Sequence, residues 1–287
     1  MTQVTNPTQP ASSLPGGGGG GGFTVIGTTG DNRLSGSPGN DIILTFGGND
    51  VVAGGSGNEL IITGGGNDSI GAGDGNDTVF SGSGADVVAG GTGDDFIFAG
   101  KGDDLVDGGD GNDLISGDRG NDTVLGGSGS DTVFGGQGND VVGGGDGNDS
   151  LFGGKDNDTV NGGAGNDFIS GDRGSDVLTG GAGSDTFYFF SSGGDYGVDT
   201  ITDFTPGEDK IRLKSGGVFS GLGTSFEASE FVVVSNFNAA TPGTATTNKL
   251  VYDPTNGALY FNGSNGVLTV AQLQPNLTIT SNSFELF

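Results

Sequence analysis

The sequence predicts an all-β chain, organised as a parallel β-solenoid with a β-rich cap at its C-terminal end. Three observations support this fold class. Gly accounts for 66 of the 287 residues, about three times its share in an average protein. A nine-residue period runs from residue 27 to residue 188 without insertion or deletion, which is typical of solenoids. Residues 189–287 lose the glycine excess and gain aromatic and β-branched runs separated by turn residues, as in ordinary β-structure.

The composition excludes several classes of function. The 36 acidic and 9 basic residues give a net charge of −27, which disfavours nucleic acids and anionic membranes as partners. The absence of Cys and His excludes disulfides, thiolate chemistry and imidazole catalysis. No run of 18 apolar residues is present, so we expect no transmembrane segment.

Residues 1–26 predict a disordered, Gly-rich N-terminal tail. The segment is rich in Thr, Gln, Pro and Ser, and residues 16–22 are seven consecutive glycines. Such a sequence cannot bury enough apolar surface to offset its ordering entropy. It also lacks the basic residues and the apolar stretch of a secretory signal peptide, so we expect none at this end.

Residues 27–188 consist of 18 nonapeptides, of which residues 108–116 (GGDGNDLIS) are representative. The fourth position is Gly in 17 repeats, with Asp156 as the exception. The sixth position is Asp in 16 repeats, Glu59 in one and Asn32 in one. The eighth position is apolar in all 18 repeats. This regularity predicts one structural unit per nonapeptide.

Each repeat predicts one turn followed by one short strand. Positions one to six are rich in Gly and Asn, which favour turns and positive φ. Positions seven to nine predict a strand, and we expect only the eighth side chain to face inward. Two repeats then form a flattened coil of 18 residues, and stacked coils form two parallel sheets with strands about 4.8 Å apart.

This stacking places the sixth-position carboxylates above one another in two columns, one on each edge. Two carboxylates about 5 Å apart repel by roughly 3 kcal/mol at an effective dielectric constant of 20. Because the turns also present backbone carbonyls, each gap between turns is an all-oxygen site, which suits Ca²⁺ better than Mg²⁺. One buried apolar side chain per repeat is a small core, so we expect metal binding to supply much of the folding free energy. The predicted metal ligands are Asp41, Asp50, Glu59, Asp68, Asp77, Asp86, Asp95, Asp104, Asp113, Asp122, Asp131, Asp140, Asp149, Asp158, Asp167, Asp176 and Asp185.

These nonapeptides resemble the RTX (repeats-in-toxin, haemolysin-type calcium-binding) family, whose pattern is G-G-x-G-x-D-x-U-x. Residues 199–211 (DTITDFTPGEDKI) and 250–260 (LVYDPTNGALY) are also similar to the segments that come after the repeats in that family. The resemblance implies a parallel β-roll that binds Ca²⁺ between neighbouring turns. It further implies an extracellular protein, secreted unfolded by type I machinery that reads an uncleaved C-terminal signal, and folded on meeting calcium. The final residues 283–287 (SFELF) fit such a signal.

Departures from the pattern limit the number of ions. Eighteen turns leave 16 gaps, and Asn32, Glu59 and Asp156 affect five of them. We expect about a dozen bound ions. The family's proteases, lipases and cytolysins carry an effector region before the repeats, where this chain has a 26-residue tail, and no G-x-S-x-G motif occurs. We therefore expect a non-enzymatic protein.

Two other functions remain open at this point. One is a calcium-dependent structural or adhesive role at the cell surface, with self-association of the repeat region. The other is a hydrolase in residues 189–287, which without His would need a carboxylate pair such as Asp203 with Glu208 or Asp209.

A duplicated block also has two interpretations. Residues 117–122 (GDRGND) return as residues 171–176 (GDRGSD), 54 residues later, and Lys101 and Lys155 share that interval. The simpler interpretation is a surface Asp–Arg pair of little energetic weight. The alternative is a ligand-binding role for the stripe that carries Arg119 and Arg173.

Overall fold

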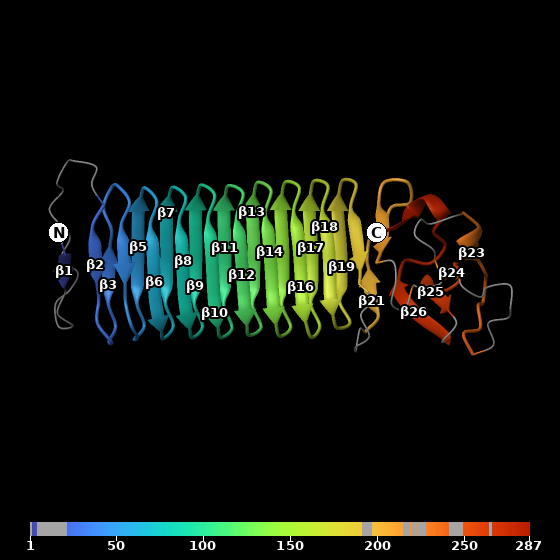
Figure 1. Cartoon of the computed structure of the whole chain (residues 1–287), viewed down its shortest axis with the longest axis horizontal. Coiled ribbons are helices and arrows are strands. Elements are labelled where there is room, and N and C mark those ends of the chain that lie inside the picture. Colours follow the sequence, from blue (N-terminus) through green and yellow to red (C-terminus); the bar gives the residue numbers. More distant parts are fainter. Residues whose placement is uncertain are drawn as a thin grey trace. The chain divides into compact units, whose positions relative to one another are not determined.

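The computed structural model describes residues 2–4, 22–190, 197–214, 219, 222, 228–240, 249–263 and 266–287. The chain divides into two compact units, residues 1–150 and residues 151–287. Regular structure in the described residues is almost entirely β-strand (Figure 1). The predicted N-terminal tail falls mostly on residues 5–21, which lie outside the described residues.

The first unit contains two parallel sheets formed by alternating strands. Its strands are β1 (Thr2–Val4), β2 (Thr24–Ile26), β3 (Arg33–Ser35), β4 (Ile42–Leu44), β5 (Val51–Ser56), β6 (Leu60–Gly65), β7 (Ser69–Asp74), β8 (Thr78–Ser83), β9 (Val87–Thr92), β10 (Phe96–Lys101), β11 (Leu105–Asp110), β12 (Leu114–Arg119), β13 (Thr123–Ser128), β14 (Thr132–Gln137) and β15 (Val141–Asp146). The even sheet has the order β1-β2-β4-β6-β8-β10-β12-β14, and the odd sheet the order β3-β5-β7-β9-β11-β13-β15.

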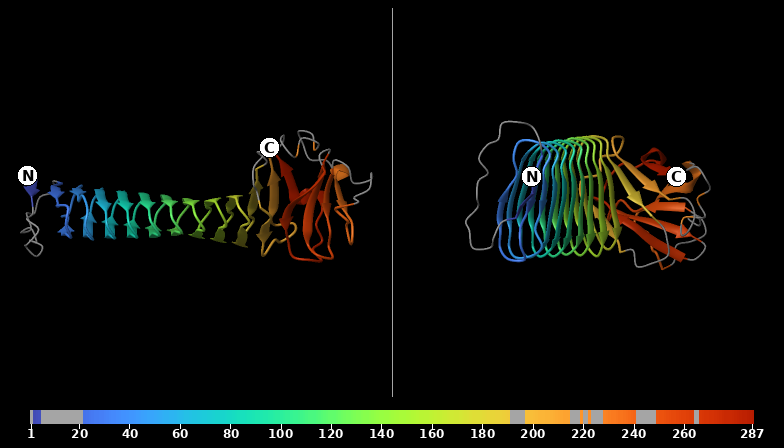
Figure 2. Two further views of the ribbon diagram at one scale, coloured as in Figure 1. Left: turned by 90° about the horizontal axis from the view of Figure 1, so that it is seen from below. Right: turned by 60° about the vertical axis from the view of Figure 1, so that its left-hand side comes forward.

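The register between neighbouring strands is 18 residues. Ile97 pairs with Val79 on one side and with Ile115 on the other, all in parallel. Two repeats therefore make one coil, with one strand in each sheet, as predicted (Figure 2). The strand β2 lies within the segment that we assigned to the tail, and it pairs in the same register with β4.

The strands are longer than the repeat pattern predicted. Interior strands span six residues, because the chain stays extended through positions one to three of the following repeat. Both Ile97, at an eighth position, and Ala99, at the next first position, are buried at 1% and 0% exposure. The expectation that only the eighth side chain faces inward is therefore wrong. First positions hold small residues because a larger one would collide: a Cβ on Gly108 would lie 2.8 Å from Cδ1 of Ile115.

Glycine at the fourth position lets neighbouring turns approach each other closely. Gly111 has φ +143°, and a Cβ on it would lie 2.0 Å from the carbonyl oxygen of Gly93, one coil earlier. Both the positive φ and the contact exclude larger residues. The glycine column thus sets how tightly the turns stack.

The second unit contains further strands of the repeat and then the C-terminal region. Its elements are β16 (Ser150–Lys155), β17 (Thr159–Ala164), β18 (Phe168–Arg173), β19 (Val177–Ala182), β20 (Thr186–Phe189), β21 (Asp199–Ile201), β22 (Lys210–Leu213), the 3-10 turn η2 (Ala228–Glu230), β23 (Phe231–Val233), β24 (Lys249–Tyr252), β25 (Ala258–Gly263), β26 (Gly266–Gln272), the 3-10 turn η4 (Ser281–Ser283) and β27 (Phe284–Leu286). Here the even sheet has the order β16-β18-β20-β22-β27, and the odd sheet the order β17-β19-β21-β26-β25-β24-β23.

The C-terminal region is β-rich, as predicted. Strands β24, β25 and β26 form an antiparallel meander, in which Tyr252, Leu259 and Phe261 are buried. The last strand, β27, pairs in parallel with β22 and buries Phe284 at 4% exposure. The chain end is therefore an integral part of the even sheet in the folded protein.

Candidate metal centre

The sixth-position acids form a hydrogen-bonded column in each edge of the coil stack. The backbone N–H of Asp77 donates to Oδ1 of Asp95 at 2.8 Å, and that of Asp95 donates to Oδ1 of Asp113 at 2.8 Å. The other edge repeats this geometry between Asp86 and Asp104, also at 2.8 Å. The acids therefore stack at an interval of 18 residues, as predicted. In this arrangement Oδ1 of each acid accepts a hydrogen bond from the backbone N–H of the acid one coil earlier.

In eleven of these acids, named at the end of this paragraph, the second carboxylate oxygen has no protein partner. It is buried, and it folds back over its own turn: a Cβ on Gly108 would lie 2.3 Å from Oδ2 of Asp113. A buried anionic oxygen without a hydrogen bond is costly unless a cation or donor reaches it. Among the described residues, Oδ2 is in this position in Asp50, Asp68, Asp77, Asp86, Asp95, Asp104, Asp113, Asp122, Asp131, Asp176 and Asp185.

Backbone carbonyls supply the remaining oxygens of each gap. A Cβ on Gly75 would lie 1.8 Å from the carbonyl oxygen of Gly57, and a Cβ on Gly73 would lie 2.1 Å from that of Gly55. Carbonyl oxygens of one turn therefore point at the α-carbons of the next turn. No three carboxylate side chains converge anywhere in the described ranges. The residues that would hold a cation here are the sixth-position acids, with backbone carbonyls of the turns as further oxygen donors, and Ca²⁺ accepts such a donor set.

Burial raises the pKa of these carboxyl groups. The pKa of Asp95 and of Asp104 is raised to about 7, and that of Asp122 and of Asp131 to about 6. Burial is the largest cause, the N–H bond at Oδ1 partly opposes it, and neighbouring carboxylates add to it. Desolvation is therefore a larger cost than the mutual repulsion expected from the sequence. A cation beside Oδ2 offsets both.

The ends of the columns differ from the middle. Both oxygens of Asp41 are used by the protein, since Oδ1 accepts the N–H of Phe23 and Oδ2 that of Ser37, each at 2.5 Å. At Glu59 both carboxylate oxygens are buried without a partner, and its pKa is raised to about 7, mainly by burial and then by Asp77. The predicted role of Asp41 as a ligand therefore has less support from the geometry than that of the interior acids.

Two further acids extend the columns beyond the repeats. The N–H of Asp176 donates to Oδ1 of Asp199 at 3.1 Å, and the N–H of Asp185 donates to Oδ1 of Asp209 at 3.0 Å. Both side chains are buried, at 9% and 3% exposure. The sequence analysis missed them because the nine-residue phase breaks after residue 188. The signal was present in residues 199–201 (DTI) and 207–211 (GEDKI), which keep the acid two residues before an apolar residue.

Two of the three carboxylates that we considered for a hydrolase, those of Asp203 and Asp209, accept backbone N–H groups. Asp203 accepts the N–H groups of Gly180 and Gly181 at 2.9 and 2.8 Å. Asp209 accepts the N–H of Thr205 at 2.7 Å in addition to that of Asp185. Both carboxylates thus hydrogen-bond the segment after the repeats to the last two repeats.

Stacked turns with paired acid columns and carbonyl-lined gaps define a parallel β-solenoid of the calcium-binding type. The family model described as RTX calcium-binding nonapeptide repeat (4 copies) matches residues 26–58, 54–88, 80–115, 89–124, 107–142, 125–160, 143–178 and 161–189. The chain belongs to this family, and its fold is the RTX β-roll. The comparison with curated proteins gives no match. Within the described residues, no helix is long and apolar enough to cross a membrane.

Proposed function

We propose that this chain is an extracellular calcium-binding RTX protein that folds on binding calcium after secretion and has no catalytic domain. The observation that carries this proposal is the row of buried, unpartnered Oδ2 atoms in the two acid columns. Each of these oxygens is removed from water and accepts no hydrogen bond from the protein. About a dozen ions would neutralise them, with the sixth-position acids from Asp50 to Asp185 as the side-chain ligands.

Calcium binding and folding are one process in this proposal. The acids come together only when the coils stack, so the unfolded chain has no preformed site. Without the ion, folding must bury carboxylates or protonate them, and the raised pKa values of Asp95 and Asp104 express that cost. Low calcium inside a cell would then keep the chain unfolded, and high extracellular calcium would fold it.

The burial of Phe284, in the segment that resembles a secretion signal of the family, supports secretion before folding. In the folded protein, β27 (Phe284–Leu286) is hydrogen-bonded to β22 and Phe284 is buried. Export machinery that reads this segment would have to do so while the chain is unfolded. A fold that waits for extracellular calcium meets that requirement.

A circular dichroism titration tests the proposal. We expect the metal-free chain to show little β-structure, and β-structure to appear cooperatively as calcium rises through roughly 10⁻⁴ to 10⁻³ M. Magnesium at the same concentrations is the control, and it should have little effect because it demands stricter octahedral geometry. A spectrum that is identical in chelator and in millimolar calcium contradicts the proposal.

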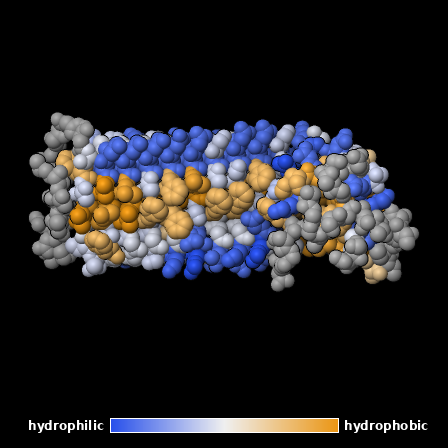
Figure 3. All heavy atoms as spheres, viewed as in Figure 1, coloured by the Kyte–Doolittle hydropathy of each residue, from blue (hydrophilic) through white to orange (hydrophobic). Residues whose placement is uncertain are grey.

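A second candidate, calcium-dependent assembly at the cell surface, is favoured by the outer face of the even sheet. Along this face an apolar stripe lies between hydrophilic bands (Figure 3). In the first unit its exposed members include Ile42, Phe96, Leu114 and Phe134, each 38–41% exposed. Contiguous apolar surface on a folded chain is typical of interaction sites. Light scattering tests this candidate: a folded, calcium-loaded protein that stays monomeric at every concentration argues against assembly.

A further inference from the structure

The two sheets of the first unit have outer faces of different character. At the ninth position of the repeat, most strands of the even sheet hold a large apolar residue, whereas most strands of the odd sheet hold a small one. The ninth-position residues are Ile26, Leu44, Ile62, Phe80, Phe98, Ser116 and Phe134 on the even sheet, and Ser35, Ala53, Gly71, Ala89, Asp107, Leu125 and Gly143 on the odd sheet. One face thus carries a row of large side chains, and the other a row of small ones.

Both rows are continuous from strand to strand. On the even sheet, Phe98 is the registered neighbour of Phe80. On the odd sheet, Gly71 is the registered neighbour of Ala53 on one side and of Ala89 on the other. A Cβ on Gly71 would meet nothing within 4 Å, so the surface above this residue is open.

Both outer faces also expose apolar side chains at the seventh position of the repeat. The exposed members are Ile42, Phe96 and Leu114 on the even sheet, and Val51, Val87, Leu105 and Val141 on the odd sheet. Removing such surface from water is favourable. Sheets that do so pack face to face about 10 Å apart, with their strands nearly aligned. Both faces are therefore suited to packing against a sheet of another chain.

The third position of the repeat gives the two faces opposite charge. On the even sheet, Lys101 at the end of β10 is the registered neighbour of Arg119 at the end of β12. On the odd sheet, β7, β11 and β15 end at Asp74, Asp110 and Asp146, each two strands from the next. No acid stands at a third position from β6 to β14 of the even sheet, and no cation from β5 to β15 of the odd sheet. The two faces are thus complementary in charge as well as in side-chain size.

The two cations of the even sheet are not neutralised within the chain. Lys101 and Arg119 have no ion-pair partner among the described residues, where the one ion pair is that between Arg212 and Glu285. The predicted Asp–Arg surface pair is therefore wrong. Two like charges on neighbouring strands repel, and a carboxylate from another chain would relieve the repulsion.

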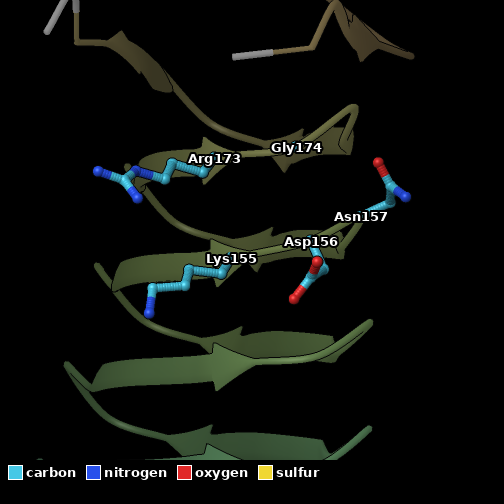
Figure 4. A pocket seen from close by; sticks show the side chains of 5 residues that line it. All are labelled: Lys155, Asp156, Asn157, Arg173 and Gly174. Atoms are coloured by element: carbon cyan, nitrogen blue, oxygen red, sulfur yellow. The ribbon is translucent and has the colours of Figure 1, made fainter. Parts of the chain in front are cut away.

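The second unit carries only half of this arrangement. Lys155 and Arg173 extend side by side from neighbouring strands of its even sheet (Figure 4). On its odd strands β17 and β19, however, the third positions hold Ala164 and Ala182. The first unit therefore presents both complementary faces by itself.

Size and charge match on the same pair of strands. On β10, Phe98 lies three residues before Lys101, and on β7, Gly71 lies three residues before Asp74. If β10 of one chain lies along β7 of another in the same direction, Phe98 covers Gly71 while Lys101 faces Asp74. Consecutive strands of a coil run in opposite directions (Figure 1), so this match makes the coil stacks of the two first units antiparallel.

Bound calcium removes the main obstacle to such a contact. The net charge of −27 keeps metal-free chains apart. About a dozen Ca²⁺ ions would carry about 24 positive charges, which would leave the loaded chain close to neutral. Contact between copies then depends on calcium through charge as well as through folding.

We propose that the outer face of the even sheet in one first unit binds the outer face of the odd sheet in a second copy of this chain, with β10 lying along β7. The inference deepens the assembly candidate above and rests on the calcium-loaded fold. Because the two faces differ, the contact is heterologous, and each pair of copies keeps one free face of each kind. Further copies can therefore add to both sides of the pair, and they form an open stack rather than a closed dimer.

Light scattering in millimolar calcium, with two variants that each block one face, tests the inference. Lys101→Glu with Arg119→Glu blocks the even face. Asp74→Lys with Asp110→Lys blocks the odd face. We expect the average mass of the wild type to rise about twofold or more as its concentration approaches ~1 mM, and each variant to stay at the 28.1 kDa of one chain. An equimolar mixture of the two variants should form dimers that do not grow, because the intact even face of one meets the intact odd face of the other.

Two further variants test the packing and the place of the contact. Gly71→Leu has room to fold, but its side chain occupies the place of Phe98 from the second copy, so it should prevent assembly. Lys155→Glu is the matched control, because it reverses the same kind of charge in the second unit, and it should assemble as the wild type does.

Three results overturn the inference. They are a folded wild type that stays monomeric at every concentration, assembly that persists in either blocked variant, or a mixture of the two variants that stays monomeric. A circular dichroism spectrum of each sample separates these results from a failure of the calcium proposal. If that proposal fails, the wild type itself is unfolded in calcium.

Discussion

Replacing one of the proposed interior ligands, Asp113, by Asn separates the calcium contribution from the hydrogen bonds of the column. Asn keeps an oxygen that can accept the N–H of Asp95, which Oδ1 of Asp113 accepts at 2.8 Å. It removes the charge at Oδ2, the buried oxygen without a protein partner. The substitution therefore weakens the ion site and leaves the neighbouring packing in place.

The expected loss follows from the number of ions that Asp113 serves. Its Oδ1 faces the preceding turn and its N–H donates to Asp131 in the following turn at 2.8 Å, so the loss is one or two ions. An ion present at 100 times its dissociation constant contributes about 2.7 kcal/mol. Asp113→Asn should therefore lower the free energy of unfolding in saturating calcium by about 3 to 5 kcal/mol. In chelator we expect Asp113→Asn to raise the free energy of unfolding instead. Burial raises the pKa of Asp113, so the buried charge is costly without the ion, and Asn removes it.

Urea unfolding at 10 mM calcium, followed by circular dichroism, measures the loss. The matched control is Asp146→Asn, which removes one charge from an exposed side chain of the first unit and should change stability by less than about 0.5 kcal/mol. Equal destabilisation of Asp113→Asn and Asp146→Asn refutes the reasoning. So does a loss in Asp113→Asn that persists in chelator.

Three other predictions concern the core, the turns and pH. Ile115→Ala, at a fully buried eighth position, should cost about 2 to 5 kcal/mol in calcium, measured by urea unfolding; a cost below 1 kcal/mol would mean that this position is not in the core. Gly111→Ala should prevent calcium-induced folding in a circular dichroism titration, because its Cβ would collide with the preceding turn, whereas Gly71→Ala, with nothing within 4 Å, should fold as the wild type does. In chelator, β-structure should increase as pH falls from about 7 toward 4. The folded pKa values of Asp95 and Asp104 are raised to about 7, so the penalty for burying them is complete above that pH and disappears once they are protonated in both states. A metal-free chain with the same β-structure at pH 7.5 and pH 4.5 would contradict this.

The nine-residue period predicted most of the coil from residue types alone. An apolar eighth position in every repeat fixes the inward residue, and an acid at the sixth position of 17 of the 18 repeats fixes the column. Both features are periodic in side-chain chemistry, so a single sequence shows them. The structure shows both features at the interval of 18 residues that two repeats make. Ile97 pairs with Ile115, and the N–H of Asp77 donates to Oδ1 of Asp95.

Features that depend on small residues or on broken phase escaped the sequence analysis. The inward first position holds Gly, Ala, Ser or Thr, whose hydropathy does not distinguish a buried place from a turn. Asp199 and Asp209 join the columns after a change of spacing, which hides them from a search at fixed period. The positive φ of Asp118 is visible only in the structure, because Asp is also common in ordinary turns.

Ion counting and chain dimensions, measured on the same sample, test the central claim most directly. Equilibrium dialysis against millimolar calcium gives the number of bound ions, and small-angle X-ray scattering gives the radius of gyration. We predict about a dozen retained ions and a compact chain in calcium. In chelator we predict no bound ions and a radius of gyration near the ~60 Å of an unfolded chain of this length. A chain that is equally compact in chelator, or one that retains no calcium after dialysis, contradicts the account.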